Sequence, residues 1–259
     1  MRTVYDIAKE TTVADTYDAT RRVPVPAGQR VINGLKYVGK RQFFGKAVTL
    51  KLLPSRADLN KETNERAKRE FGVSSLRSHA ISLCDENSVL VIDASGYNHS
   101  AIGGSTSMSS LAVRGAQAIV SDGAIRDRED FKEYSEKYGM SLAVADFTVQ
   151  SGTGSALYPY DVNTPVSVHG VLIRPGDYIF GDEDGILVIP EDVAVDVLEC
   201  GIMVAKYDKY IRILSEEKGL IQGKDIDVSS PNFIDPFLEW AQFSPIQLEM
   251  YNTYQRPKN

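Results

Sequence analysis

The fold is decided by residues 103–130, which read GGSTSMSSLAVRGAQAIVSDGAIRDRED. Two glycines open the stretch, and because they lack a Cβ they let the backbone approach neighbouring atoms closely. Residues 106–113 are predicted to form a helix. The short apolar run at 118–120 has the length of a buried strand.

Charged residues follow the predicted strand directly. Asp122 and Gly123 predict a turn, and Arg126, Asp127 and Asp130 come after it. Many α/β enzymes present a polar site on a loop at the end of a buried strand. The simpler interpretation is structural, because an Arg-Asp pair at a strand end also serves as an ion pair or a turn cap.

Residues 88–93, SVLVID, form the clearest predicted strand. Their apolar residues do not alternate with polar ones, which indicates burial on both faces of a sheet. With the helix at 106–113 and the strand at 118–120 they make a β-α-β pattern, whose parallel strands end at one edge of the sheet. We expect the following residues to lie within reach of one another there: Asp93, Gly103, Gly104, Asp122, Arg126 and Asp127.

The remaining segments predict an α/β fold. Strands are expected at 43–50, at 141–149 and in a meander over 166–189, and helices at 60–71, at 131–138 and from Pro190 to about Lys218.

The C-terminal segment combines prolines with aromatic residues, which indicates an ordered extension rather than a flexible tail. We therefore predict a single catalytic domain over residues 1–205. A helical, aromatic extension over residues 206–259 is predicted to pack on this domain or on a neighbouring subunit.

The composition is that of a globular protein, with 42% hydrophobic and 25% charged residues. Lys and Arg total 29 against 35 Asp and Glu, and an acidic chain without a basic cluster is not expected to bind nucleic acid. The apolar stretches are too short to span a membrane, and the charged N-terminus lacks a signal sequence. Cys84 and Cys200 have no zinc-ligand spacing and are expected to be reduced thiols. These features predict a cytoplasmic protein.

The pair Arg126 and Asp127, with Asp122 nearby, suits chemistry on a small 2-oxo acid. A carboxylate can hold Mg²⁺ or Mn²⁺ while water and substrate oxygens fill the other positions. An arginine binds a substrate carboxylate through two parallel hydrogen bonds. A metal ion chelated by the 2-oxo acid would withdraw electrons from the carbonyl and stabilise the enolate left when a C–C bond breaks.

Residues 120–127, VSDGAIRD, resemble the signature of a family of aldolases and regulators. It contains the 4-hydroxy-4-methyl-2-oxoglutarate and 4-carboxy-4-hydroxy-2-oxoadipate aldolases and the RraA-type regulators of ribonuclease E. In that family a glycine precedes an Arg-Asp pair and an acid follows it, here Asp130. Similar stretches occur in the same order over residues 10–200: VAD at 13–15, GKAVT at 45–49, VLVID at 89–93, PVSV at 165–168, RPGD at 174–177 and DEDGILVIP at 182–190.

The resemblance implies a β/β/α layered, RraA-like domain that assembles into a homotrimer or a hexamer with its sites between subunits. It implies a divalent metal ion, Mg²⁺ or Mn²⁺, held by Asp127, and a substrate carboxylate held by Arg126. Asp122 would then orient metal-bound water. Asp182 or Glu183 of a neighbouring subunit would assist a water molecule.

The glycine-rich start of the central stretch is expected to bind the substrate through its backbone. The substrate-binding residues that follow from this comparison are Arg126, Gly103, Gly104, Ser105, Thr106 and His99. His99 is open to two interpretations, as a substrate contact or as a solvent-facing loop residue. At the spacing that separates the family's glycine from its Arg-Asp pair, this chain has Ser105, and the nearest glycine, Gly104, lies one residue earlier. Substrate contacts are therefore expected to differ from those of the known aldolases.

The resulting hypothesis is a lyase that cleaves a C–C bond of a small 2-oxo acid through a metal-bound enolate. The reaction would be a retro-aldol cleavage or an oxaloacetate-type decarboxylation. One alternative is another enolate reaction, such as tautomerisation or hydration. The other is a non-catalytic regulatory binding protein of the RraA type, although the complete Arg126-Asp127 pair favours an enzyme.

Overall fold

The computed structural model describes residues 2–39, 42–152 and 156–255. The chain forms two compact units, which are Ala27–Glu191 and the combination of Met1–Pro26 with Asp192–Asn259. The first unit contains all the site residues that the sequence predicts.

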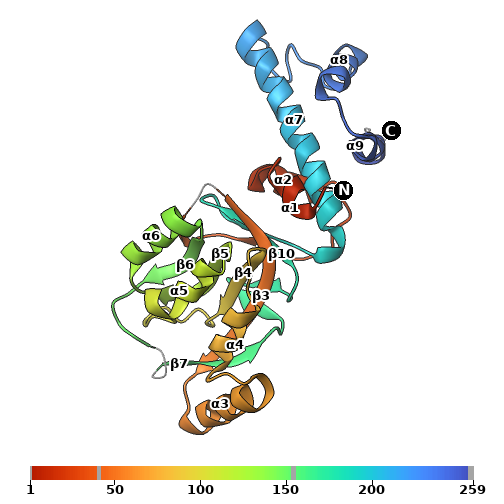
Figure 1. Cartoon of the computed structure of the whole chain (residues 1–259). Coiled ribbons are helices and arrows are strands. Elements are labelled where there is room, and N and C mark those ends of the chain that lie inside the picture. The colour runs from red at the N-terminus through yellow and green to blue at the C-terminus, as the bar shows by residue number, and fades with distance from the viewer. Residues whose placement is uncertain (1, 40–41, 153–155, 256–259) are drawn as a thin grey trace. The chain divides into compact units, whose positions relative to one another are not determined.

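A mixed sheet forms the first unit (Figure 1). Strands β3, β4, β5 and β6 pair in parallel, and the outer strands pair antiparallel. The strand order is β1 (Val31–Ile32), β11 (Ile186–Ile189), β10 (Tyr178–Asp182), β3 (Gln42–Pro54), β4 (Ser88–Asp93), β5 (Ala118–Ile125), β6 (Ser141–Phe147) and β2 (Lys36–Val38), and β7 (Leu157–Val162) pairs with the C-terminal part of β3.

The predicted β-α-β pattern is confirmed. In the parallel pair, Val89 of β4 lies opposite Ala118 of β5, and α5 (Ser105–Val113) connects the two strands. The helices predicted at 60–71 and 131–138 are also present, as α3 (Ala57–Phe71) and α6 (Arg128–Tyr138), and α4 (Leu76–Leu83) is a further helix that was not predicted. The carboxyl ends of β4 and β5 therefore meet at one edge of the sheet, where α5 and α6 begin.

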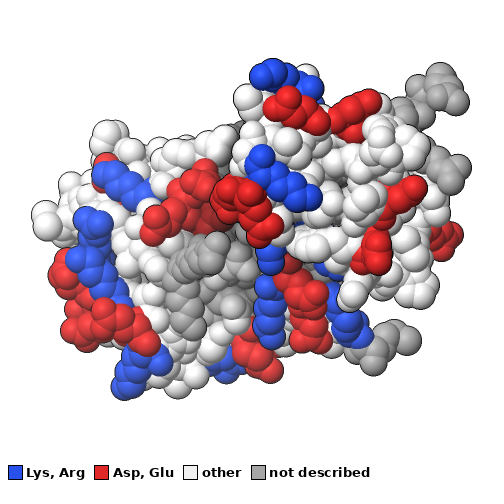
Figure 2. Space-filling model, turned by 90° about the horizontal axis from the view of Figure 1, so that it is seen from above, with Lys and Arg blue, Asp and Glu red and all other residues white. Residues whose placement is uncertain are grey.

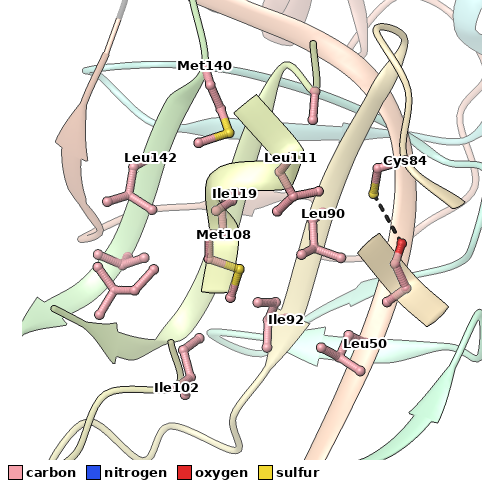
Figure 3. Close-up of a cluster of buried hydrophobic side chains, with 14 of the residues drawn as sticks. Leu50, Cys84, Leu90, Ile92, Ile102, Met108, Leu111, Ile119, Met140 and Leu142 are labelled. Carbon is pink, nitrogen blue, oxygen red and sulfur yellow. Dashed lines mark hydrogen bonds between the residues drawn. The ribbon is translucent and has the colours of Figure 1, made fainter. Parts of the chain in front are cut away.

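Burial on both faces of β4 is confirmed, since all its residues are buried. Leu90 and Ile92 point into a core that α4, α5 and α6 cover, together with Met108 and Leu111 of α5 (Figure 3). Val89 and Val91 point to the opposite face and belong to a second core. Successive side chains of a strand alternate between faces, so two apolar environments produce an apolar run without polar interruptions.

The second core gives the domain its layers. Its members include Val166 and Val168 of β8 (Val166–Val168) and Val171 and Ile173 of β9 (Val171–Ile173), which form a separate antiparallel hairpin. Helices thus cover one face of the main sheet and a β-hairpin packs into the core on the other. This arrangement confirms the α/β class and the β/β/α layering.

The predicted turn at Asp122 and Gly123 is wrong. Both residues lie within β5, which continues to Ile125, and the pairing of β5 with β6 shifts its register between Ser121 and Ala124. A Cβ on Gly123 would lie 2.8 Å from the Cβ of Ala94, so glycine permits this irregularity. Glycine inside a strand often marks such a bulge or a close approach of chains.

The second unit is helical. It comprises α1 (Val4–Ala8), α2 (Val13–Ala19), α7 (Ala194–Lys218), α8 (Pro231–Ala241), α9 (Pro245–Met250) and a final helical turn, Tyr251–Gln255, while a short 3₁₀ turn, Glu191–Val193, precedes α7. Thr12 is the N-cap residue of α2, and its hydroxyl oxygen accepts a hydrogen bond from the N–H of Asp15 at 3.1 Å. Helix α7 ends at Lys218 as predicted, with Gly219 as its left-handed cap. No helix in the described ranges is both long and apolar enough to cross a membrane.

Aromatic rings hold the C-terminal helices together. Phe237 of α8 is 1% exposed, and its ring lies 5.5 Å from that of Tyr210 on α7 and 5.6 Å from that of Phe243. A buried pair adds to this packing, because Gln247 Nε2 donates to Glu199 Oε2 at 2.7 Å. The boundary predicted between residues 205 and 206 falls within α7, and the division into two domains there stays a prediction.

The surface charges are mixed. On the face drawn in Figure 2, basic and acidic side chains are interspersed, as expected from 29 basic and 35 acidic residues.

Candidate active site

Asp127 joins three elements of the domain. It follows β5, occupies the N-cap position of α6 without a side-chain capping bond, and has a left-handed backbone with φ 66° and ψ 47°. Few residues other than glycine adopt this conformation, and Asp and Asn are among those that tolerate it. The carboxylate turns toward α5, where Oδ2 accepts hydrogen bonds from the Ser105 N–H at 3.0 Å and from Ser105 Oγ at 3.3 Å.

Gly104 makes room for this carboxylate. A Cβ at residue 104 would lie 2.4 Å from Asp127 Oδ2 and 2.9 Å from Arg126 Cγ and Nε. These distances are shorter than van der Waals contact, so a larger residue would displace the Arg-Asp pair. Arg126 Nε in turn lies 3.5 Å from Asp127 Oδ2. The Arg-Asp pair therefore requires glycine at residue 104, one residue before Ser105, the position at which the family comparison places its glycine.

A cavity of about 270 Å³ opens beside the pair. It is lined by Arg77, Ala101, Gly103, Gly104, Thr106, Ser107, Arg126, Asp127 and Ser151. The structure thus brings together Gly103, Gly104, Thr106, Arg126 and Asp127 of the predicted set. Ser105 does not line the cavity, but its N–H donates a hydrogen bond to the carboxylate of Asp127.

The N-terminus of α5 supplies donors to this cavity. The N–H of Gly104 donates to Ser107 Oγ at 3.1 Å, and that of Ser105 donates to Asp127. No hydrogen bond within the described part of the chain uses the N–H of Gly103 or of Thr106. Unpaired N–H groups and the helix dipole favour an anion at such a position.

Asp122 has a different environment. It is 4% exposed, and its two oxygens accept hydrogen bonds from the N–H groups of Ala94, at 2.6 Å, and Gly96, at 2.7 Å. Burial raises the pKa of the Asp122 carboxyl above its ordinary value, while the two donors oppose the rise. The side chain fixes the loop after β4 and does not line the cavity. Its predicted role in orienting water stays a prediction.

Other predicted residues lie outside the cavity. His99 is exposed, and its ring packs edge-on against Tyr97 at 5.5 Å. Asp93 accepts hydrogen bonds from the N–H groups of Ser95 and Ser167, at 2.8 and 3.3 Å. Asp182 is the last residue of β10, and Glu183 lies in the turn between β10 and β11. Their action across a subunit interface, and the substrate contact of His99, stay predictions.

Arg77 is the lining residue that the sequence did not indicate. It lies on α4, in a segment that carries no recognisable motif, and its side chain is brought to the cavity only by packing of α4 on the sheet.

The residues fit a metal ion that keeps most of its water. The described residues contain no group of three or more His, Cys, Asp or Glu side chains that could hold a metal ion. Mg²⁺ often uses only one or two carboxylates, with water and substrate as the other ligands. The hydrogen bonds of Asp127 within the described ranges go to Oδ2, which leaves Oδ1 for such a ligand.

The fold and the cavity define an α/β protein with a candidate anion site at a helix N-terminus. Residues 11–188 match the profile of the RraA-like family, described as Aldolase/RraA. The chain therefore belongs to the RraA-like family, which confirms the resemblance inferred from residues 120–127.

Relatives within this family carry different names. An uncharacterised protein of Methanocaldococcus jannaschii is 25% identical over 202 residues, which cover 77% of this chain and 84% of that protein. The 4-hydroxy-4-methyl-2-oxoglutarate aldolase of Thermus thermophilus is 24% identical over 184 residues, or 71% of this chain and 93% of that protein. The structure of Streptomyces coelicolor RraAS2, an unusual member of the RNase ES inhibitor RraA protein family, matches with a TM-score of 0.63 and 21% identity over 81% of this chain and 96% of that chain. The last likeness concerns the fold alone.

Proposed function

We propose that the protein is a divalent-metal-dependent lyase that cleaves a C–C bond of a small 2-oxo acid. The observation that carries the proposal is the cavity in which Arg126 and Asp127 lie beside the N-terminus of α5. The similarity to a named aldolase over most of both chains supports the same reaction class.

Each residue then has a defined task. Arg126 binds the carboxylate next to the keto group through its planar guanidinium. The N–H groups of Gly103 and Thr106 donate to the oxygen that gains negative charge during cleavage. Ser105 orients Asp127 by two hydrogen bonds, and Asp122 positions the loop of Ala94 and Gly96.

Asp127 is the residue that would hold Mg²⁺ or Mn²⁺. When bound, the ion would act as a Lewis acid that polarises the keto group and stabilises the enolate product of cleavage. Retro-aldol cleavage and decarboxylation of an oxaloacetate-like acid share this requirement.

The test measures pyruvate release by the full chain from 4-hydroxy-4-methyl-2-oxoglutarate and from oxaloacetate in the presence of Mg²⁺. Arg126→Ala and EDTA should each abolish it, whereas Arg128→Ala should not. Arg128 is a matched control because it is the next arginine in the chain, stacks over the ring of Phe147 at 5.1 Å and does not line the cavity. Activity that survives both Arg126→Ala and EDTA would refute the proposal.

Two alternatives predict different results in the same experiment. Tautomerisation or hydration would consume the acid without releasing pyruvate, which NMR of the products detects. A regulatory binding protein of the RraA type would show neither turnover nor metal binding by calorimetry. The proposal includes assembly of the chain into a homotrimer or a hexamer, and sedimentation velocity measures the oligomeric state.

A further inference from the structure

The irregularity in β5 lies just before the Arg-Asp pair, and a buried serine occupies its start. Ser121 pairs with Val144 of β6, and the next pair along the two strands is Ala124 with Asp146. Two residues of β5 therefore stand opposite one residue of β6, which defines a β-bulge. Ser121 is also the last residue of β5 that pairs with β4, where its partner is Ile92. At Ser121 the strand thus ends its pairing with β4 and interrupts its pairing with β6.

Two hydrogen bonds fix the Ser121 side chain at this point. Its Oγ donates to the carbonyl oxygen of Ile92 at 2.7 Å and accepts from the N–H of Gly123 at 3.0 Å. Ser121 is 0% exposed, so solvent does not reach its side chain, and neither β4 nor β6 pairs with Gly123. A buried backbone N–H that lacks a partner costs free energy. The hydroxyl therefore stabilises the bulge by bonding to the backbone on both sides.

Beyond the bulge, β5 acquires a different neighbour, the segment that leads into the cavity. The N–H of Ile102 donates to the carbonyl oxygen of Ala124 at 2.8 Å, and the N–H of Arg126 donates to that of Gly103 at 3.2 Å. Gly103 belongs to the cavity lining. The bulge therefore lies where the pairing of β5 changes from β4 to this segment, directly before the Arg-Asp pair.

The bulge determines which side of the strand presents Arg126 and Asp127. Successive side chains of a strand point to opposite faces, so one residue more or less in β5 turns every later side chain to the other face. The place of the extra residue is fixed as well, because a Cβ on Gly123 would lie 2.8 Å from Ile102 Cγ2. A side chain there would displace its neighbours, so the bulge cannot move along the strand without strain.

We propose that Ser121 is a positioning residue, whose hydroxyl holds the bulge of β5 in the geometry that brings Arg126 and Asp127 to the N-terminus of α5. Ser121 does not line the cavity and acts through the backbone of Ile92 and Gly123. The expected effect on catalysis rests on the proposed function, whereas the expected effect on the position of the pair does not.

Ser121→Ala tests the assignment, because it removes the hydroxyl and leaves the volume of the side chain nearly unchanged. Hydrogen exchange followed by mass spectrometry reports on the backbone bonds of residues 101–105 and 122–127. Loss of one hydrogen bond changes a local opening equilibrium about 10-fold, so exchange in both segments should become about 10-fold faster. Misplacement of the Arg-Asp pair should also lower kcat/KM for pyruvate release at least about 10-fold.

Matched variants separate positioning from stability. Ser141→Ala removes another serine hydroxyl that is 0% exposed in the same sheet and accepts a hydrogen bond from Tyr37 Oη at 3.1 Å. Ser141 pairs with Ala118 at the start of β5 and does not line the cavity. Its loss should lower the melting temperature and leave kcat/KM and the exchange of both segments unchanged. Ser121→Thr keeps the hydroxyl and should restore both readouts. If Ser121→Ala does not fold, Ser121→Cys takes its place, because a thiol is a weak donor and acceptor.

The outcomes for the two proposals differ. Unchanged exchange in both segments of Ser121→Ala, or an equal acceleration in Ser141→Ala, would overturn the assignment of Ser121. Faster exchange with an unchanged kcat/KM, in a chain whose native form is active, would overturn the role of Ser121 in catalysis. Faster exchange that is confined to Ser121→Ala, in a chain that releases no pyruvate from any acid, would uphold the positioning of the pair and refute the lyase.

Discussion

Replacement of Gly104 by alanine should disturb the Arg-Asp pair, and so lower the activity, while the chain stays folded. Gly104 has extended backbone angles, φ −145° and ψ −179°, which any residue adopts, so the effect of Gly104→Ala comes from the added Cβ alone. That atom would lie 2.4 Å from Asp127 Oδ2, about 1 Å inside a normal contact. The carboxylate must therefore move and weaken its bonds to Ser105.

The magnitude follows from that displacement. A shift of about 1 Å in a catalytic group can reduce the rate about 100-fold, and overpacking costs about 1–3 kcal/mol of the free energy of unfolding. We expect kcat/KM for pyruvate release to fall about 100-fold while the protein remains folded at 25 °C.

The assay combines pyruvate release with thermal unfolding of the same samples. Gly201→Ala is the matched control, because its Cβ would lie 2.8 Å from Thr11 Oγ1, within the helical unit, and Gly201 does not line the cavity. It should lower the melting temperature and leave kcat/KM unchanged. If Gly104→Ala retains kcat/KM within twofold, the reasoning about the Arg-Asp pair is wrong.

Three further predictions concern stability. Asp122→Asn should cost about 1–3 kcal/mol in urea unfolding, because the amide can accept only one of the two backbone N–H bonds through its oxygen. Burial raises the pKa of the Asp122 carboxyl above 3.8 in the folded state. The protonated carboxyl therefore stabilises the folded chain fully below pH 3.8, and this part of the free energy of unfolding is lost as the pH rises through the folded-state pKa. The Asn variant should lack this pH dependence when its unfolding is measured at several pH values. Gln247→Ala should cost about 1.5–3 kcal/mol by removing a donor from the buried Glu199 carboxylate, and a double replacement by leucine at both positions should recover part of the loss. Phe237→Ala should cost about 3–5 kcal/mol by leaving a cavity among the aromatic rings, whereas an unchanged melting temperature would contradict the packing of α8 on α7.

The sequence predicts most of the central sheet because local patterns and tertiary burial agree there. Residues 89–92 are apolar throughout, and the two cores on either side of β4 explain that run. The helix expected at 106–113 is set by residues close to one another in the chain, so sequence reasoning predicts it, and α5 spans Ser105–Val113.

The parts that sequence reasoning missed depend on contacts between distant residues. Asp122 and Gly123 have the composition of a turn, but the strand continues because Gly123 fits against Ala94 and the Asp122 carboxylate accepts bonds from the loop after β4. Arg77 reaches the cavity only through the packing of α4 on the sheet, and no local pattern encodes that.

The left-handed backbone of Asp127 has a consequence for how this fold can change over generations. Asn tolerates the same backbone angles as Asp, so Asp127→Asn removes the negative charge without disturbing the junction of β5 and α6. A change of one nucleotide converts an aspartate codon to an asparagine codon. A chain with this architecture therefore stands one mutational step from a descendant that keeps the folded cavity but loses the carboxylate, and its binding surface could then be selected for another purpose.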